Sequence, residues 1–236
     1  MTTSEITESI IQDLKVFGNS DRISKIAKDH PTSMQVLGLK VPDQRKVIDD
    51  WRRKLSHFSE IEWIELSIAL INVDILECQQ VAFEFLWKNK KALQSLNLDQ
   101  IFALSKTLDN WVSVDMFCLC IAGYNWRTGK IQDDIIETWA KSENRWIRRS
   151  ALVSTVPLNL RARGGTGDVE RTLRICKMLI ADYDDMIVKA MSWALRELSK
   201  SDKKAVEEFL DENEGRLHPR VKREVYTKLV TGKKNG

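Results

Sequence analysis

Trp111 and Asp115 are four residues apart in NWVSVD, residues 110–115, which opens an otherwise apolar run. On a helix this spacing places both side chains on one face, one turn apart. A carboxylate there can face a cation, and the indole beside it offers a flat apolar surface. The simpler interpretation is an ordinary acid in the first turns of a helix, where the helix dipole favours negative charge. Taken alone, the pair favours this simpler interpretation, because surface acids are common.

Two later segments combine cations with an aromatic side chain at helical spacing. These residues are Arg145, Arg148 and Arg149 in NRWIRRSAL, and Lys189, Trp193 and Arg196 in KAMSWALREL. In the second segment the spacing is i, i+4 and i+7, which is one side of a helix. Such a combination suits a nucleic-acid backbone, since arginine binds phosphate bidentately and indole packs on sugar or base. A carboxylate would repel phosphate, so Asp115 fits this surface only if it faces a cation.

The charge of the chain is small overall but unevenly distributed. The 236 residues carry a formal net charge of +3, with 21 Lys and Arg against 14 Asp and Glu from residue 141 onward. The first 140 residues contain 16 Lys and Arg against 20 Asp and Glu. A basic second half indicates a polyanionic partner, whereas the alternative is an ordinary solvated helix surface.

Several classes of protein are disfavoured by what the sequence lacks. The N-terminus has no basic start followed by an apolar core, and no uncharged apolar run approaches the roughly 18 residues of a membrane span. We therefore expect a soluble, cytoplasmic protein with no membrane partner. The histidines lie far apart and no C-x-x-C pair is present, which predicts no metal site and no cofactor. A hydrolase that uses a catalytic cysteine and histidine remains an alternative, although no local sequence motif supports it. The residues concerned are Cys78, Cys118, Cys120, Cys176, His30, His57 and His218.

Apolar residues recur at helical spacing along nearly the whole chain, and only 4 prolines and 10 glycines interrupt it. This pattern predicts helices joined by short turns. Ser20 and Ser59 are expected to cap helices, the latter with Glu62 in a capping box. The glycine cluster RARGGTG, residues 161–167, is expected to be a mobile surface loop. The predicted helices cover residues 3–16, 20–29, 42–55, 59–73, 75–89, 98–108, 110–124, 130–142, 144–156, 168–182, 184–200, 202–214 and 218–230.

About a dozen helices of this kind fit an all-α solenoid of stacked antiparallel pairs, with degenerate repeats because no strict period is visible. We expect a single domain over residues 1–236, acting as a monomer. A compact globin-like bundle is the alternative. A solenoid would line one concave face with one helix from each pair, and that face could hold an extended partner.

Four segments in this order resemble blocks of the AlkD-type DNA alkylation repair glycosylases. They are LGLKVPDQRKV, NWVSVD, WAKSENRWIRRSAL and KAMSWALRELSK, and the similarity that they mark extends over nearly the whole chain. The resemblance implies an α-solenoid of HEAT-like repeats with a basic concave face that binds duplex DNA. It also implies release of N3- and N7-alkylated purines as free bases, without a metal and without flipping the lesion into a pocket.

The resemblance assigns roles to individual residues. It places the catalytic aspartate on Asp115, the cleft tryptophans on Trp111 and Trp193, and a DNA-binding arginine on Arg148. The neighbouring cations Arg145, Arg149, Lys189 and Arg196 are expected to bind DNA. The family motif reads W-W-D-T-V-D, and here Asn110, Val112 and Ser113 replace its first tryptophan, its aspartate and its threonine. The tryptophan and aspartate of the motif, W-x-x-x-D, are therefore retained, whereas the residues around them differ.

The expected function is excision of cationic bases such as 3-methyladenine and 7-methylguanine in base excision repair, by a protein associated with the nucleoid through DNA. A fixed carboxylate would stabilise the positive charge that develops on the deoxyribose as the bond breaks. No histidine is close in sequence to Trp111 or Trp193, so no acid for protonating a neutral base is evident. The alternatives are a non-catalytic relative that binds distorted DNA, and a HEAT-like scaffold for protein interaction.

Overall fold

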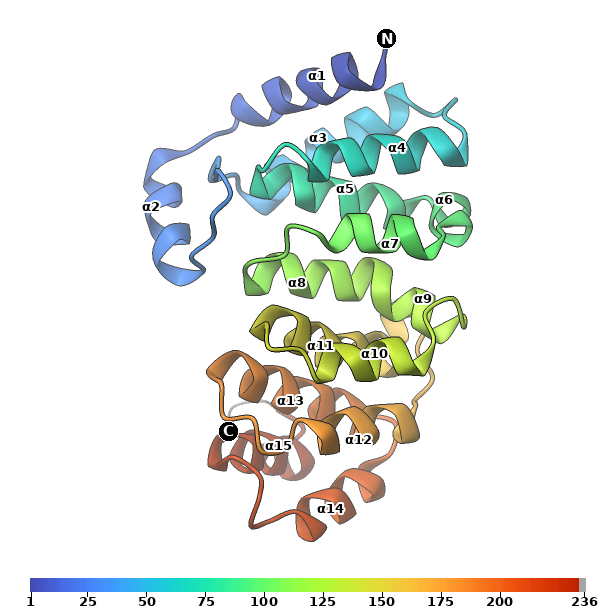
Figure 1. The fold of residues 1–236 in the computed structure, drawn as a ribbon. Coiled ribbons are helices and arrows are strands. Elements are labelled where there is room, and N and C mark those ends of the chain that lie inside the picture. Colours follow the sequence, from blue (N-terminus) through green and yellow to red (C-terminus); the bar gives the residue numbers. More distant parts are fainter. Residues whose placement is uncertain (234–236) are drawn as a thin grey trace. The chain divides into compact units, whose positions relative to one another are not determined.

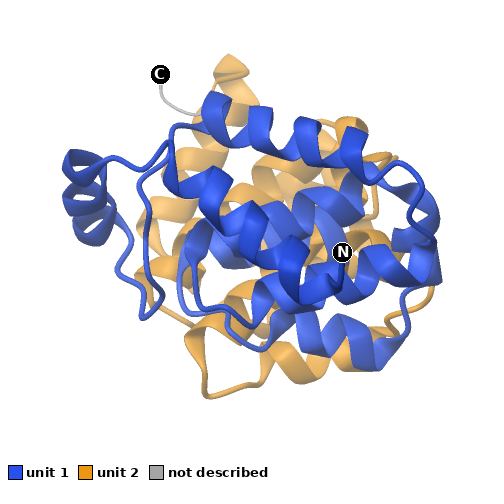
Figure 2. Ribbon diagram, turned by 90° about the horizontal axis from the view of Figure 1, so that it is seen from above, with its two compact units in different colours: residues 1–121 blue, residues 122–236 orange. Residues whose placement is uncertain are grey.

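The computed structural model describes residues 1–233, and its regular structure is helical (Figure 1). Within these residues strand-type pairing is limited to an isolated bridge between Gln35 and Ile75. The chain forms two compact units, residues 1–121 and 122–236, which are coloured separately in Figure 2. Consecutive helices stack on one another in each unit, which confirms the all-α solenoid class. The single domain and the basic concave face stay predictions.

Unit 1 is organised around two central helices, α4 and α5. The helix α4 contacts α1, α5, α6 and α7, and α5 also contacts α3 and α8. Phe83 of α5 and Phe117 of α8 are fully buried, with 5.9 Å between their ring centroids, and this contact fixes α8 on α5. The helices of unit 1 are α1 (Thr3–Lys15), α2 (Ser20–Asp29), α3 (Val41–Lys54), α4 (Glu60–Ile71), α5 (Leu76–Lys88), α6 (Lys90–Ser95), α7 (Leu98–Ser105) and α8 (Trp111–Phe117).

The helix starts in unit 1 follow local sequence signals, with one correction. Ser59 and Glu62 form the predicted capping box at α4, with the Ser59 N–H donating to the Glu62 carboxylate at 2.8 Å. Ser20 is not a cap, because Asn19 takes that position and accepts from the Arg22 N–H at 3.0 Å. An asparagine side chain caps a helix at least as well as serine, and this one lies one residue earlier.

Unit 2 is built around α11, which contacts α9, α10, α12 and α13, while α13 in turn packs on α15. Gly123 of α9 lies so close to α11 that a Cβ atom there would be 2.6 Å from a ring carbon of Pro157. Only glycine permits this approach. The helices of unit 2 are α9 (Gly123–Arg127), α10 (Asp133–Ala140), α11 (Arg145–Asn159), α12 (Val169–Met178), α13 (Asp185–Leu198), α14 (Lys203–Glu212) and α15 (Pro219–Thr231).

Two segments differ from the helices and loops that the sequence predicts. The single helix expected over 110–124 is divided by a π-helix, η1 (Cys118–Ala122), between α8 and α9. The expected mobile loop at 161–167 instead begins with a 3₁₀ turn, η2 (Arg161–Arg163), and packs tightly. A Cβ atom on Gly165 would lie 2.5 Å from the Pro157 carbonyl oxygen. The guanidinium of Arg127 donates to the Arg163 carbonyl at 2.7 Å, which ties the loop to α9.

Candidate functional site

The predicted pair in unit 1 lies at the start of α8. Asn110 is the N-cap, and its side chain accepts from the Ser113 N–H at 3.0 Å. Trp111 is therefore the first residue of the helix and Asp115 follows one turn later. Trp111 is 36% exposed, whereas Asp115 is half-buried. An accessible aromatic surface thus lies one turn from a carboxylate, as the spacing predicts.

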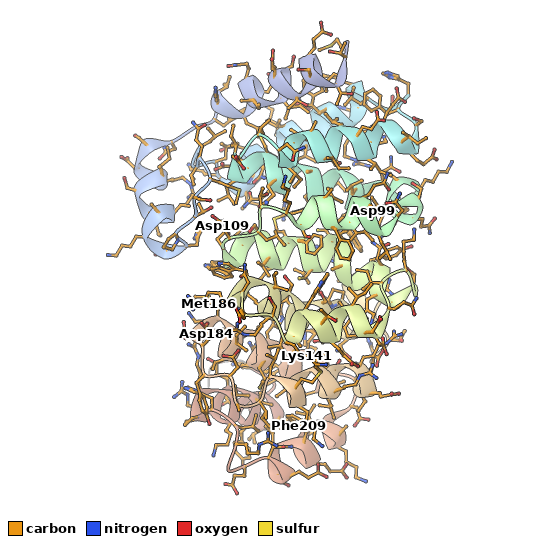
Figure 3. All side chains as sticks on the ribbon, in the orientation of Figure 1. Asp99, Asp109, Lys141, Asp184, Met186 and Phe209 are labelled. Carbon is orange, nitrogen blue, oxygen red and sulfur yellow. The ribbon has the colours of Figure 1, made fainter. Side chains whose placement is uncertain are left out.

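Asp109, the residue before the N-cap, is labelled in Figure 3. It is the centre of a hydrogen-bond cluster that joins the start of α8 to the segment after α2. One carboxylate oxygen accepts from the Thr32 hydroxyl at 2.7 Å and from the Asn110 amide at 2.9 Å. The other accepts from both the backbone N–H and the hydroxyl of Ser33. Burial by itself raises the pKa of the Asp109 carboxyl, but these hydrogen bonds outweigh burial and hold the pKa below its ordinary value.

The same segment brings a histidine against Trp111. The rings of His30 and Trp111 meet edge to face with 5.4 Å between their centroids, and the Trp111 N–H donates to the Asp29 carbonyl at 3.5 Å. Burial lowers the pKa of His30, although the charges of Asp29 and Glu77 oppose the shift. His30 is therefore neutral at neutral pH. The two residues are 81 positions apart, so the sequence carried no signal of this contact.

In unit 2, two of the predicted arginines lie at the start of α11 and form ion pairs. Arg145 binds the Asp184 carboxylate at 2.7 Å and keeps 45% of its side chain exposed. Arg148 binds Asp182 at 2.7 Å and also donates to the carbonyls of Ser142 and Glu143, at 2.9 and 2.7 Å. Only 20% of the Arg148 side chain is exposed. Arg145 is thus the more accessible of the two to a ligand.

Arg149 differs from its neighbours because it is buried, with 5% of the residue exposed. Its guanidinium donates to the carbonyl of Met186, which is labelled in Figure 3 and lies in the first turn of α13, and this hydrogen bond ties α11 to α13. This position supports a structural role rather than direct contact with a ligand. The sequence suggested Arg149 as a DNA-binding residue because Arg145, Arg148 and Arg149 lie on or near one face of a helix. Arg148 and Arg149 nevertheless point in directions about 100° apart, and in the structure Arg149 is turned toward α13.

The three predicted residues of α13 also differ in exposure. Lys189 pairs with Asp185 at 2.6 Å and is 40% exposed, whereas Trp193 is half-buried. Arg196 is only 14% exposed and donates to the Ser192 hydroxyl at 3.1 Å. Burial lowers the pKa of Arg196, against the opposing charges of Glu224 and Glu197. Arg145 and Lys189 are therefore the accessible cations, and Arg148, Arg149 and Arg196 are largely held by partners within unit 2.

Other chemistry finds little support in the described residues. Within residues 1–233, no group of three or more His, Cys, Asp or Glu side chains is arranged to hold a metal ion. All four cysteines are buried, and burial raises the pKa of Cys78 and of Cys176 to about 12. Such thiols stay protonated and are poor nucleophiles. In the same part of the chain, no helix has both the length and the apolar character needed to cross a membrane.

Comparison with known proteins adds independent information. The sequence model of one family, described as DNA alkylation repair enzyme, matches residues 10–229. A search of curated protein sequences finds no significant match. A solved structure described as a predicted DNA alkylation repair enzyme from Enterococcus faecalis is similar, with a TM-score of 0.72 and 20% sequence identity. The similarity covers 91% of this chain and 97% of that one, and at this identity it bears on the fold alone.

Proposed function

This chain belongs to the DNA alkylation repair enzyme family, and we propose that it is a DNA glycosylase that excises cationic N3- and N7-alkylated purines from duplex DNA. Membership confirms the predicted resemblance and gives the protein a role in alkylation repair with DNA as its partner. The finer assignment rests on one observation. An exposed indole, Trp111, and a carboxylate, Asp115, lie one turn apart at the start of α8.

The chemistry follows from the charge of the lesion. Alkylation at N3 or N7 makes the purine cationic, so the base leaves as a neutral molecule with the electrons of the glycosidic bond. Positive charge moves onto the deoxyribose, and a fixed carboxylate at Asp115 stabilises it. Water then adds to the sugar carbon and releases a proton. The base needs no added proton in this sequence, because the alkyl group has already made it a good leaving group.

Trp111 contributes a surface on which the sugar and backbone of the damaged nucleotide can pack. The face of an indole also attracts positive charge, which favours the cationic lesion and the developing sugar cation. Trp193 of α13 offers a second indole surface on which DNA can pack, and it is half-buried. Recognition of this kind requires no closed pocket, so we propose that excision proceeds without flipping the base.

The cations of unit 2 supply affinity for the DNA backbone in this proposal. Arg145 and Lys189 are the most accessible of the predicted cations, at 45% and 40% exposure of their side chains. Each is paired with an acidic residue, and a DNA phosphate would either displace that residue or bind the same cation beside it. Arg148, Arg149 and Arg196 are held more firmly and would mainly fix the helices that carry the accessible groups. Binding of this type is insensitive to sequence and weakens with salt.

The test is incubation with duplex DNA that contains a single 7-methylguanine or 3-methyladenine, followed by chromatographic detection of the free base. Release above the spontaneous rate, lost in Asp115→Asn, would support the proposal. Salt-dependent DNA binding without base release would instead indicate a non-catalytic relative that binds damaged DNA. Absence of both would favour a scaffold for protein interaction.

A further inference from the structure

The Trp111 indole makes a hydrogen bond and a ring contact with a remote segment, residues 29–33. The indole N–H donates to the Asp29 carbonyl at 3.5 Å, and the His30 ring lies edge-on against the indole. Trp111 is also the first residue of its helix. A terminal residue of a helix has few hydrogen bonds of its own and frays readily. The orientation of the indole therefore depends on where the remote segment lies.

Asp109 fixes this segment to the start of α8. Its carboxylate accepts hydrogen bonds from Thr32 and Ser33 on one side and from the Asn110 amide on the other. Asn110 in turn caps α8 through its side-chain oxygen, with 3.0 Å to the Ser113 N–H. A continuous set of hydrogen bonds thus runs from the remote segment, through Asp109 and Asn110, to the helix that carries Trp111 and Asp115.

The other end of the same stretch is fixed independently by a second carboxylate. Glu77 is 3% exposed and accepts the backbone N–H groups of Leu37 and Gly38 at 3.0 and 2.8 Å. The stretch from Asp29 to Leu39 is therefore anchored near both ends. Loss of the Asp109 anchor would release only the end that contacts Trp111, because Glu77 would still hold the remainder.

We propose that Asp109 is a positioning residue for Trp111: its carboxylate clamps residues 29–33 against the start of α8 and so holds the indole in the orientation that contacts the damaged nucleotide. A carboxylate suits this role because both oxygens accept and neither donates, and the cluster presents four donors. An amide in its place would bring an N–H₂ group against hydroxyl and N–H donors. The Asp109→Asn variant should therefore loosen the clamp without a large change in shape.

The chain offers a matched control. Glu62 accepts from the backbone N–H and the hydroxyl of Ser59 at the start of α4, as Asp109 does from Ser33. Glu62→Gln thus makes the same carboxylate-to-amide change, with the same loss of one negative charge, at a helix that does not carry Trp111. Ser33→Ala removes one donor from the Asp109 cluster and provides a milder variant should Asp109→Asn fold poorly.

The first experiment records the indole N–H resonances of ¹⁵N-labelled protein and needs no enzymatic activity. The Trp111 resonance is assigned with Trp111→Phe. It should shift or broaden in Asp109→Asn and in Ser33→Ala and stay unchanged in Glu62→Gln. An unchanged Trp111 resonance in both cluster variants would overturn the proposal, whatever the protein excises.

The second experiment rests on the proposed function and measures the single-turnover rate of 7-methylguanine release. Misplacing a binding group by about 1 Å can reduce a rate by about a hundredfold, so we expect a tenfold or greater loss in Asp109→Asn. In the Trp111→Ala background the same substitution should have no further effect. Equal losses in both backgrounds would show that Asp109 does not act through Trp111. If the parent protein releases no base, the proposed function fails, and the resonance experiment still decides the role of Asp109.

Discussion

The rings of His30 and Trp111 meet edge to face at 5.4 Å, so the indole expected to contact DNA has a titratable neighbour. Burial lowers the pKa of His30, with Asp29 and Glu77 opposing the shift. A histidine with a lowered pKa is largely uncharged at neutral pH, and the N–H that the neutral ring keeps is too weak an acid to protonate a leaving base. The presence of His30 beside Trp111 therefore does not change the expectation that catalysis depends on the charge of the lesion.

Cationic adducts should accordingly be excised at pH 7 and neutral lesions should not. A 7-methylguanine has a glycosidic bond weakened by its own charge, whereas hypoxanthine does not. The measurement compares free-base release by one preparation from matched duplexes that carry either base. Similar release of both would mean that an acid operates in the site, and loss of hypoxanthine release in His30→Phe would then identify it.

Replacing Asp115 by asparagine should abolish or sharply reduce base release while leaving DNA affinity unchanged or improved. The substitution removes the charge that stabilises the developing sugar cation, and it also removes repulsion of phosphate. Loss of such a stabiliser typically costs about 3–4 kcal/mol, or a few hundred-fold in rate. Single-turnover excision and DNA binding are measured side by side. Excision at the parental rate would refute the assignment of Asp115.

Arg145 and Arg149 should respond in opposite ways to substitution by alanine. Arg145 is accessible, so Arg145→Ala should lower the slope of log K against log salt by about one with little effect on unfolding. Arg149 is buried and donates to the Met186 carbonyl, so Arg149→Ala should destabilise the protein by about 1–3 kcal/mol. Salt titrations and denaturant unfolding of both variants distinguish the roles. A reduced salt slope with full stability in Arg149→Ala would contradict the structural role.

Asp133 should make a contribution to stability that depends on pH. Burial raises the pKa of its carboxyl, but hydrogen bonds from Trp126 and Arg174 and the charges of Arg171 and Arg174 outweigh burial and lower the pKa. The ionised form is thus favoured in the folded state. Its contribution is fully present above the ordinary pKa of about 3.9 and is lost as the pH falls through the lowered value.

Asp133→Asn should therefore reduce the free energy of unfolding at pH 7, and the difference from the parent should shrink below about pH 4. The loss at pH 7 should be about 1–3 kcal/mol, because the indole N–H of the buried Trp126, which donates to Asp133 at 2.7 Å, loses its charged acceptor. Asp134→Asn is the control, since within residues 1–233 its exposed carboxylate accepts only from the adjacent Ile135 N–H. A difference that does not change with pH would contradict this account.

The sequence by itself determined where the helices form and where many of them begin and end. Periodic apolar residues predicted the all-α solenoid, and the Ser59–Glu62 capping box predicted the start of α4. The spacing of Trp111 and Asp115 was sufficient to place them one turn apart on one helix. These features depend on interactions between residues three or four apart, and such interactions are present in the local sequence. The sequence did not predict the π-helix at Cys118–Ala122, because its geometry departs from the regular α-helical spacing on which the prediction relied.

Only the tertiary structure decided which polar groups meet. Asp109 and Ser33 are 76 residues apart, and nothing near either residue specifies the other. Arg148 and Arg149 are adjacent in sequence, yet one is partly exposed and the other buried, because Arg148 pairs with Asp182 before α13 whereas Arg149 reaches the Met186 carbonyl within it. Burial and hydrogen bonding across helices depend on how complete helices pack. That packing set which cations stay accessible and placed His30 and Asp109 beside the candidate site.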